Sequence, residues 1–540
     1  MSDKISRRGF LKTSVFAGAA LGLGFAGAPA VSVNNRFDTI IRNGIIYTGE
    51  LRPPLKGDIG IKNGRISAIG DLGDSADIIA DAGGKAVSPG FIDIHTHTDT
   101  NMYDAPLGDS KIYQGVTLDI GGNCGDSPFP SKKWDGVGEF MSDYSKIERG
   151  INYGTLVGQG SLRSRFVGDN NVPATPEQLR QMIAYMEVQM ERGAQGISCG
   201  LEYTPGSYAT EVEIAEICKV VGKHGGLFSI HMRNEDDRVE EAVAEAIRIA
   251  RMAGVRLQIS HLKAQNAANW HKAPALLKQI EQAKSSGVDI AFDRYPYIAF
   301  STGMSTFIPI NDRQGTTDEI IARLSDQTSA SKIGDYAKSR FERLGGAQNV
   351  VITSCKKEEN KRFIGKNVIE AAAMAGGMDS WEFVRNLLIE ERVNVDIIGF
   401  AMREENVSLF LSHPLGMPAS DGSVYSPVGR LGQTMPHPRS YGTMPRFFAK
   451  YWREARLMDL QTAVHKATAL PASRLKLKDR GILMPGYKAD VVVFNPDTIE
   501  DRATFDNPHQ FAAGIEHVFV NGIWTIRDGK ATGKLGGELC

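Results

Sequence analysis

The middle of this chain repeats a short apolar run followed by an amphipathic helical pattern, at intervals of about 30 residues, the usual length of a βαβ unit. Leu227–Ile230 and Leu257–Ser260 are two such runs, and Val239–Ile247 between them has apolar residues at helical spacing. Strands that alternate with helices in this way form a parallel sheet. The pattern predicts an α/β fold with a (β/α)₈ TIM-like barrel, which the 540 residues can form together with a smaller domain.

Both ends of the chain carry β-hairpin patterns instead. Asn-Gly pairs that begin at Asn43, Asn63 and Asn521 separate short apolar runs, as in tight hairpin turns. We expect a small β-sandwich domain built from residues 36–88 and 480–535, and a barrel over residues 89–479. A polar, charged run around residues 311–395 is expected to be an insertion in that barrel.

The extreme N-terminus has the pattern of an export signal. Arg7 and Arg8 precede a short, glycine-rich apolar run, and Ala28-Pro29-Ala30 is similar to a signal-peptidase site. The pattern predicts a Tat-type signal peptide over residues 1–30, transit through the Tat export machinery, and a periplasmic or extracellular protein. A membrane anchor is the alternative, but the run is short and broken by glycines.

Composition argues against two classes of protein. The chain has 62 basic and 63 acidic residues, so its net charge of −1 lacks the basic footprint of a nucleic-acid binder. Its five cysteines are sparse and odd in number, so a disulfide framework is not expected. The oligomeric state is left open.

The sharpest chemical pattern is His95-Thr96-His97, which follows the apolar run Val87–Ile94. Residues i and i+2 of a strand point the same way, and barrel active sites lie at the carboxyl ends of the strands. Two imidazoles in this position are expected to bind one cation. Two ordinary surface histidines are the alternative reading.

Other metal-binding residue types also follow apolar runs. Cys124 follows Val116–Ile120, and Asp421 comes some way after Val407–Leu411, which we read as a strand. Two histidines complete the set: His231 follows Leu227–Ile230, and His261 follows Leu257–Ser260. Nitrogen, thiolate and carboxylate donors are those that Zn²⁺ favours. Zinc lowers the pKa of a bound water to about 7 and polarises a carbonyl, and Asp421 is expected to act as the general acid/base.

These residues resemble the amidohydrolase superfamily and, within it, the N-acyl-D-amino-acid deacylases (D-aminoacylases), from about Phe37 to Gly529. The paired histidines mark the superfamily, and the Cys124 loop and the HMRNE and SHLK segments are specific to this branch. The matching segments are Pro89–His97, Gly121–Gly125, Ser198–Gly206, His231–Glu235, Gln258–Lys263, Tyr295–Tyr297, Ser420–Gly422, His437–Arg439 and Gly442–Arg446.

The resemblance implies how the metal is bound. A tightly held Zn²⁺ would lie on Cys124, His231 and His261, and His95 and His97 would form a second, weaker site. The number of metals in the working enzyme stays open. No lysine stands at a matching strand end, which argues against the branch that hydrolyses cyclic amides.

The resemblance also implies anchors for a free α-carboxylate on the substrate, namely Lys263, Tyr295 and Arg439. A guanidinium suits this task because it can pair with a carboxylate through two hydrogen bonds. Solvated surface charges, or core packing for the tyrosine, are the alternatives. Two departures are Gln159, where relatives have histidine, and Cys199, where serine or threonine is usual.

The expected activity is zinc-dependent hydrolysis of N-acyl-D-amino acids to a carboxylate and a free D-amino acid. A dipeptidase or another amidase of the same superfamily, acting on a different linear amide, is the alternative. An inactive barrel used as a scaffold is disfavoured, because the set of metal-binding residues is complete. The substrate side chain, the acyl group and the D or L preference are open at this point.

Overall fold

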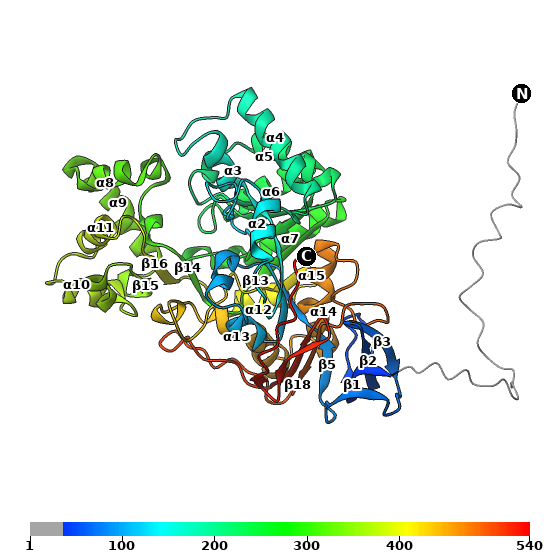
Figure 1. The fold of residues 1–540 in the computed structure, drawn as a ribbon. Helices are drawn as coiled ribbons and strands as arrows, with labels where there is room; N and C mark the ends of the chain where they lie inside the picture. Colours follow the sequence, from blue (N-terminus) through cyan, green and yellow to red (C-terminus); the bar gives the residue numbers. More distant parts are fainter. Residues whose placement is uncertain (1–35) are drawn as a thin grey trace, which may run out of the picture. The chain divides into compact units, whose positions relative to one another are not determined.

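The computed structural model describes residues 36–540, of which Phe37–Cys540 form one compact unit (Figure 1). The expected signal peptide at residues 1–30 lies outside the described residues. Within them, fifteen α-helices and both parallel and antiparallel strand pairs give an α/β fold. No helix in this part of the chain is long and apolar enough to cross a membrane.

Two parallel sheets carry the middle of the chain. The smaller has the order β6-β7-β8 and the larger the order β17-β13-β12-β11-β10-β9. Their bounds are β6 Phe91–Asp93, β7 Val116–Gly121, β8 Asn152–Thr155, β9 Val157–Gly158, β10 Gly196–Gly200, β11 Leu227–His231, β12 Arg256–Ile259, β13 Ile290–Arg294 and β17 Gly416–Pro418. Only Leu156 separates β8 from β9, and a parallel bridge between Thr96 and Gly422 links the loops beyond β6 and β17.

Amphipathic helices connect consecutive strands of the larger sheet. They are α4 Pro176–Glu191, α5 Glu211–Lys223, α6 Val239–Ala253 and α7 Ala273–Ser285. Helix α4 begins with a capping box between Thr175 and Gln178 and has proline at its start, while α6 ends at Gly254 in the left-handed conformation. The backbone groups at a helix end lack hydrogen-bond partners within the helix. These terminal residues either bond to such groups or hold the backbone in the conformation that the helix end requires.

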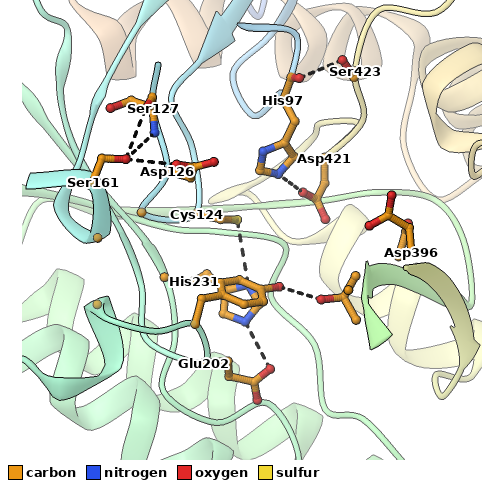
Figure 2. A pocket seen from close by; sticks show the side chains of 18 of the residues that line it. His97, Cys124, Asp126, Ser127, Ser161, Glu202, His231, Asp396, Asp421 and Ser423 are labelled. Carbon is orange, nitrogen blue, oxygen red and sulfur yellow. Dashed lines mark hydrogen bonds and ion pairs between the residues drawn. The ribbon is translucent and has the colours of Figure 1, made fainter. Parts of the chain in front are cut away.

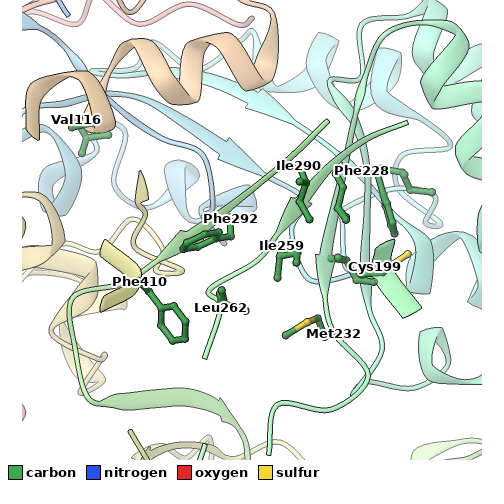
Figure 3. Packing of buried hydrophobic residues seen from close by; sticks show 14 of the residues in the cluster. Val116, Cys199, Phe228, Met232, Ile259, Leu262, Ile290, Phe292 and Phe410 are labelled. Atoms are coloured by element: carbon green, nitrogen blue, oxygen red, sulfur yellow. The ribbon is translucent and has the colours of Figure 1, made fainter. Parts of the chain in front are cut away.

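Many side chains of these strands lie in one large apolar cluster (Figure 3), and others lie in a smaller one. Phe228, Ile259, Ile290 and Phe292 come from three neighbouring strands and are at most 1% exposed. Each such side chain contributes about 1.5–3 kcal/mol when it is fully buried. This packed interior holds fixed the strand ends on which the polar residues of the next section lie.

The two ends of the chain meet in one nine-stranded sheet. Its order is β21-β20-β19-β18-β5-β1-β2-β3, with β4 paired to β1. The bounds are β1 Phe37–Ile46, β2 Leu55–Lys62, β3 Arg65–Gly70, β4 Ala76–Asp81, β5 Ala86–Pro89, β18 Val491–Phe494, β19 Ile515–Val520, β20 Ile523–Arg527 and β21 Lys530–Ala531. The nine strands are hydrogen-bonded in one sheet.

Two of the three expected hairpin turns are present, at Asn63 between β2 and β3 and at Asn521 between β19 and β20. The turn expected at Asn43 is wrong, because this residue lies inside β1, where the register with β2 shifts. Asn43 has φ of 57° there, and its backbone N–H donates to Asp58 Oδ1 at 3.0 Å. Positive φ occurs in some bulges as well as in tight turns, so the Asn-Gly pair alone does not separate them.

The segment after β13 contains a further antiparallel sheet with the order β14-β16-β15. Its strands are β14 Ala299–Gly303, β15 Val350–Ser354 and β16 Asp396–Phe400, and its main helices are α8 Thr317–Ser325, α9 Gln327–Arg343 and α11 Ser380–Glu390. The segment has its own apolar cluster, which includes Phe307, Phe341 and Val384. This cluster reaches from Tyr295 to Met402, beyond the expected insertion at residues 311–395.

Two strand expectations near the site are corrected. Val407–Leu411 lies in helix α12 (Glu404–Ser412), and the strand before Asp421 is the short β17. A short apolar run fits a buried helix as well as a strand, which is why the pattern misled. The run Val87–Ile94 is divided at Gly90 between β5 and β6, which belong to different sheets. A Cβ at Gly90 would lie 2.0 Å from Thr117 Oγ1, so the close approach there requires glycine.

A buried lysine ties the loop beyond β17 to β6. Lys111 of helix α1 (Asp109–Ile112) donates to Asp93 Oδ2 at 2.7 Å and to Ser420 Oγ at 2.6 Å. The Ser420 backbone N–H donates to the other oxygen of Asp93 at 2.9 Å. Since Asp421 follows Ser420, this contact helps to place the carboxylate of the site.

Replacement of this lysine with an apolar side chain tests that link. Lys111→Met leaves Asp93 buried and without its cation, which costs about 3–5 kcal/mol. We expect a clear fall in the Tm measured by calorimetry. The control Lys219→Met removes a half-exposed lysine paired with Glu216 and is expected to change stability by less than about 0.5 kcal/mol. Equal Tm values for the two variants would contradict the assigned role of Lys111.

Candidate active site

The structure brings the six expected metal-site residues together in two groups that share Cys124, although they lie far apart in the sequence. Four of the six are labelled in Figure 2: His97, Cys124, His231 and Asp421. His95 and His97 follow β6, Cys124 follows β7, and His231 ends β11. His261 follows β12, and Asp421 follows β17. All except His95 line one cavity of about 1650 Å³, together with the expected substrate residues Lys263, Tyr295 and Arg439.

One group consists of a thiol and two imidazoles. Cys124 Sγ lies 3.5 Å from His261 Nε2 and 3.9 Å from His231 Nδ1, and the two nitrogens are 3.0 Å apart. Burial raises the pKa of the Cys124 thiol, but the neighbouring imidazoles outweigh burial and hold this pKa well below its usual value. The sulfur is therefore a thiolate, which is the form that binds metals.

Glycines allow the thiolate loop to come close to β10. Cys124 itself has φ of 52°, and a Cβ on Gly200 would lie 1.9 Å from the Cys124 carbonyl oxygen. The Gly125 N–H donates to Ser198 Oγ at 2.9 Å, and that hydroxyl donates to the Gly122 carbonyl at 2.6 Å. The loop is thus held to β10 on both sides of the sulfur.

A second group adjoins the first. His95 Nε2 lies 3.3 Å from Cys124 Sγ and 3.3 Å from Asp421 Oδ1, and His97 Nε2 lies 2.9 Å from that same oxygen. Asp421 Oδ2 accepts from the Arg439 guanidinium at 2.6 Å. Burial raises the pKa of Asp421, but the charges of Arg439, His261 and His95 bring it well below its usual range. Asp421 is therefore a carboxylate.

The residues present fit zinc. Three donor atoms of Cys124, His231 and His261 face one another at 3.0–3.9 Å, which suits ligands that share one ion at bond lengths of about 2.0–2.3 Å. The donor set is a thiolate with two imidazoles, which Zn²⁺ prefers over the oxygen ligands suited to Mg²⁺ or Ca²⁺. His95, His97 and Asp421 form a second donor group with the same sulfur.

The three expected substrate residues differ in whether their polar groups already have partners within the protein. Lys263 donates to both carboxylate oxygens of Glu235 at 2.7 Å, and Arg439 is paired with Asp421. The Tyr295 hydroxyl is buried and has no hydrogen-bond partner among the described residues. The Arg439 guanidinium also lies over the Tyr295 ring, 4.9 Å from its centroid. Tyr295 is thus the one of the three whose polar group has no partner here.

Three acidic residues at the site had no role in the sequence analysis. Glu235 lies 3.0 Å from His261 Nδ1, Asp293 Oδ1 lies 3.1 Å from His95 Nδ1, and Glu202 lies 3.4 Å from His231 Nε2. Asp293 stands near the end of β13, so the strand-end pattern that identified the histidines applies to it as well. Glu235 and Glu202 fall inside motifs that were already recognised.

The two departures from the family pattern are both buried. The side-chain amide of Gln159 has no hydrogen-bond partner among the described residues. Burial raises the pKa of the Cys199 thiol well above its usual value, so this sulfur stays protonated. Cys199 is therefore a weak nucleophile, and neither residue takes part in the metal-binding groups.

An α/β fold whose cavity is lined by a thiolate, imidazoles and a carboxylate defines a metal-dependent hydrolase of the amidohydrolase type. The chain belongs to the amidohydrolase family, whose model matches residues 79–525. N-acyl-D-glutamate deacylase of Alcaligenes xylosoxydans xylosoxydans is 35% identical over 91% of this chain and 94% of its own length. D-aminoacylase of the same organism is 33% identical over 93% of this chain and 97% of its own length.

Solved structures agree with this assignment. N-acyl-D-glutamate deacylase from Bordetella bronchiseptica, complexed with zinc and a phosphonate inhibitor that mimics the tetrahedral intermediate, has a TM-score of 0.80 and 33% identity. The match covers 93% of this chain and 99% of that one. A D-aminoacylase structure described as having a binuclear metal center has a TM-score of 0.79 and 32% identity with the same coverage.

Loss of the thiolate tests the metal site directly. Cys124→Ser replaces the thiolate with a hydroxyl that does not ionise at neutral pH. We expect zinc affinity to fall by more than the roughly 10–100-fold caused by loss of a group behind a metal ligand. Competition with a chromogenic chelator measures this. Cys218→Ser, at a buried thiol of α5, is the control and is expected to keep its zinc. Full zinc affinity in Cys124→Ser would exclude the sulfur as a ligand.

Proposed function

We propose that this protein hydrolyses the amide bond of N-acyl-D-amino acids and releases a carboxylate and a free D-amino acid. The observation that carries the proposal is the thiolate–imidazole group of Cys124, His231 and His261 beside the carboxylate of Asp421 in one cavity. The D-amino-acid substrate class comes from the relatives, two of which are an N-acyl-D-glutamate deacylase and a D-aminoacylase.

Cys124, His231 and His261 would hold a tightly bound Zn²⁺, with His95 and His97 beside a weaker site. Zinc in this position supplies an acidified water and polarises the scissile carbonyl. Asp421 is ionised, so its free lone pairs can accept a proton from the attacking water and return it to the leaving nitrogen. Arg439 and His97 both contact Asp421 and fix the direction of its oxygens.

Substrate anchoring is proposed for Tyr295, Arg439 and Lys263. The Tyr295 hydroxyl can donate to an α-carboxylate without giving up another partner. Arg439 and Lys263 are ion-paired, so they would share their hydrogens between the substrate and Asp421 or Glu235. Both cations still attract an anion, because each carries more N–H donors than its present carboxylate uses.

We also propose a finer description of the fold. The two parallel sheets would form one closed (β/α)₈ barrel, supported by the continuity of β8 with β9 and by the bridge between Thr96 and Gly422. The nine-stranded sheet would fold over its own core as a β-sandwich, supported by an apolar cluster drawn from both chain ends that includes Ile59, Val87 and Val491.

The test of the proposed function is amine release from paired N-acetyl-D- and N-acetyl-L-amino acids by the zinc-loaded enzyme. A strong preference for the D series is expected. The same assay, run with different amino acids, ranks the substrate side chains by rate of hydrolysis. Asp421→Asn keeps the shape of the side chain and is expected to lose about 10²–10⁴-fold in kcat. Its zinc content, measured in parallel, should match that of the wild type.

Two results would redirect the assignment. No turnover of either series by zinc-loaded protein would move the substrate to dipeptides or other linear amides. Unchanged activity in Asp421→Asn would remove this residue from the proton transfers while leaving the amidohydrolase assignment in place.

We propose, finally, that the chain is exported by the Tat machinery to the periplasm or beyond the cell. Arg7 and Arg8 before a short apolar run support this. Arg7→Lys/Arg8→Lys is expected to leave the precursor in the cytoplasm, as judged by fractionation and immunoblotting. Lys12→Arg, the matched control, should be exported and shortened. Normal export of the double variant would exclude the Tat route.

A further inference from the structure

Glu235 is a buried carboxylate that links one expected metal ligand to one expected substrate residue. Its side chain is 2% exposed and lies just beyond β11, four residues after His231. It accepts from Lys263 Nζ at 2.7 Å on both oxygens, from Gln265 Nε2 at 2.8 Å, and lies 3.0 Å from His261 Nδ1. A carboxylate is not buried in this way without a strong electrostatic reason.

Two groups compete for His261 Nδ1. Glu235 Oε1 lies 3.0 Å from it and Lys263 Nζ lies 2.7 Å from it. An ammonium can only donate and a carboxylate can only accept, so each favours a different position of the hydrogen on the ring. A hydrogen on Nδ1 donates to Glu235, whereas a bare Nδ1 accepts from Lys263.

The choice matters because the other ring nitrogen faces the metal-binding group. His261 Nε2 lies 3.5 Å from Cys124 Sγ and 3.0 Å from His231 Nδ1. A neutral imidazole carries one hydrogen, so Nε2 has a lone pair for a metal only when Nδ1 carries that hydrogen. Donation from Lys263 to Nδ1 would put the hydrogen on Nε2 and block it.

We propose that Glu235 is a positioning residue that sets the tautomer of His261 so that Nε2 is available to zinc. It does so by accepting the Nδ1 hydrogen, in competition with the third hydrogen of the Lys263 ammonium, whose other two hydrogens can bond to the Glu235 oxygens. Carboxylates behind metal-binding histidines fix ring orientation and hydrogen placement in this manner.

The backbone around His261 is held by contacts that do not involve the Glu235 carboxylate. The effect of this carboxylate on the imidazole can therefore be tested apart from the backbone. The His261 N–H donates to Asp293 Oδ1 at 2.8 Å, and His261 has φ of 35°. The Gln265 N–H donates to the Glu235 carbonyl at 2.7 Å, which involves the backbone of Glu235 and not its carboxylate. Substitution of the Glu235 side chain therefore leaves these backbone contacts in place.

The proposal rests on the proposed zinc site and is tested by zinc affinity of the full chain, measured by competition with a chromogenic chelator. Glu235→Leu removes the acceptor and frees Lys263 to donate to the ring, so affinity is expected to fall about 10–100-fold. Lys263→Met removes the competing donor, so affinity is expected to equal or exceed that of the wild type. The zinc affinity of Glu235→Leu/Lys263→Met is expected to lie between those of the two single variants. Neither an acceptor nor a donor then favours one tautomer of His261.

The double variant also guards against failure to fold. Glu235→Leu alone buries an unpaired ammonium, whereas the double variant replaces the ion pair with apolar groups, a change that folded proteins often tolerate. Glu235→Gln keeps an oxygen that can accept from Nδ1 and is expected to lose less than about tenfold in zinc affinity. A loss as large as in Glu235→Leu would instead make Glu235 itself a metal ligand and would overturn the proposal.

A buried ion pair that does not line the cavity is the matched control. Arg163 donates to both oxygens of Glu213 at 2.6 and 2.5 Å, and neither residue lines the cavity. Arg163→Met/Glu213→Leu is expected to keep wild-type zinc affinity. Wild-type affinity in both Glu235→Leu and its double variant, or an equal loss in Lys263→Met, would overturn the role of Glu235. Absence of tight zinc in the wild type would instead contradict the proposed function, so the two failures are distinguishable.

Discussion

The contact between the Cys124 thiolate and the imidazoles around it is the interaction on which the rest of the site depends. A thiolate buried in a protein interior is costly unless positive or polar groups surround it. His95, His231 and His261 provide those groups at 3.3–3.9 Å, and each comes from a different strand end. The Cys124 loop also runs so close to β10 that a Cβ on Gly200 would lie 1.9 Å from the Cys124 carbonyl oxygen.

Charge balance extends outward from this sulfur. Asp421 is paired with Arg439, Glu235 with Lys263, and Asp293 holds His95. Acceptors and donors thus alternate from the metal-binding atoms to the residues expected to bind substrate. A substrate carboxylate would enter a network in which cations already have partners, so binding would redistribute hydrogen bonds and not simply add one. Tyr295 is the exception, since its hydroxyl has no partner among the described residues.

The sequence was most informative where a residue type and its place at a strand end had to coincide. His95, Cys124, His231 and His261 were expected together on this basis, and they do meet. Asp421 was expected for the wrong reason, because the apolar run Val407–Leu411 is a helix and the true strand β17 has three residues. Short apolar runs do not distinguish a strand from a buried helix, so such positions need tertiary information.

Ion pairing was what the sequence did not reveal. Lys263 and Arg439 were expected to bind the substrate carboxylate, and no sequence pattern indicated that each contacts a carboxylate of the protein itself. Glu235 is 28 residues before Lys263, and Asp293 is 198 residues after His95, so no local pattern joins either pair. The bulge at Asn43 is similar, since one dipeptide serves both bulges and turns and only the strand partner decides between them.

Zinc X-ray absorption of the purified enzyme tests the central claim, that a thiolate and imidazoles share the metal. The account predicts one sulfur neighbour at about 2.3 Å and nitrogen or oxygen neighbours at about 2.0–2.2 Å. A spectrum fitted by nitrogen and oxygen alone, with no sulfur, would contradict it, since Cys124 would then lie beside the metal without binding it.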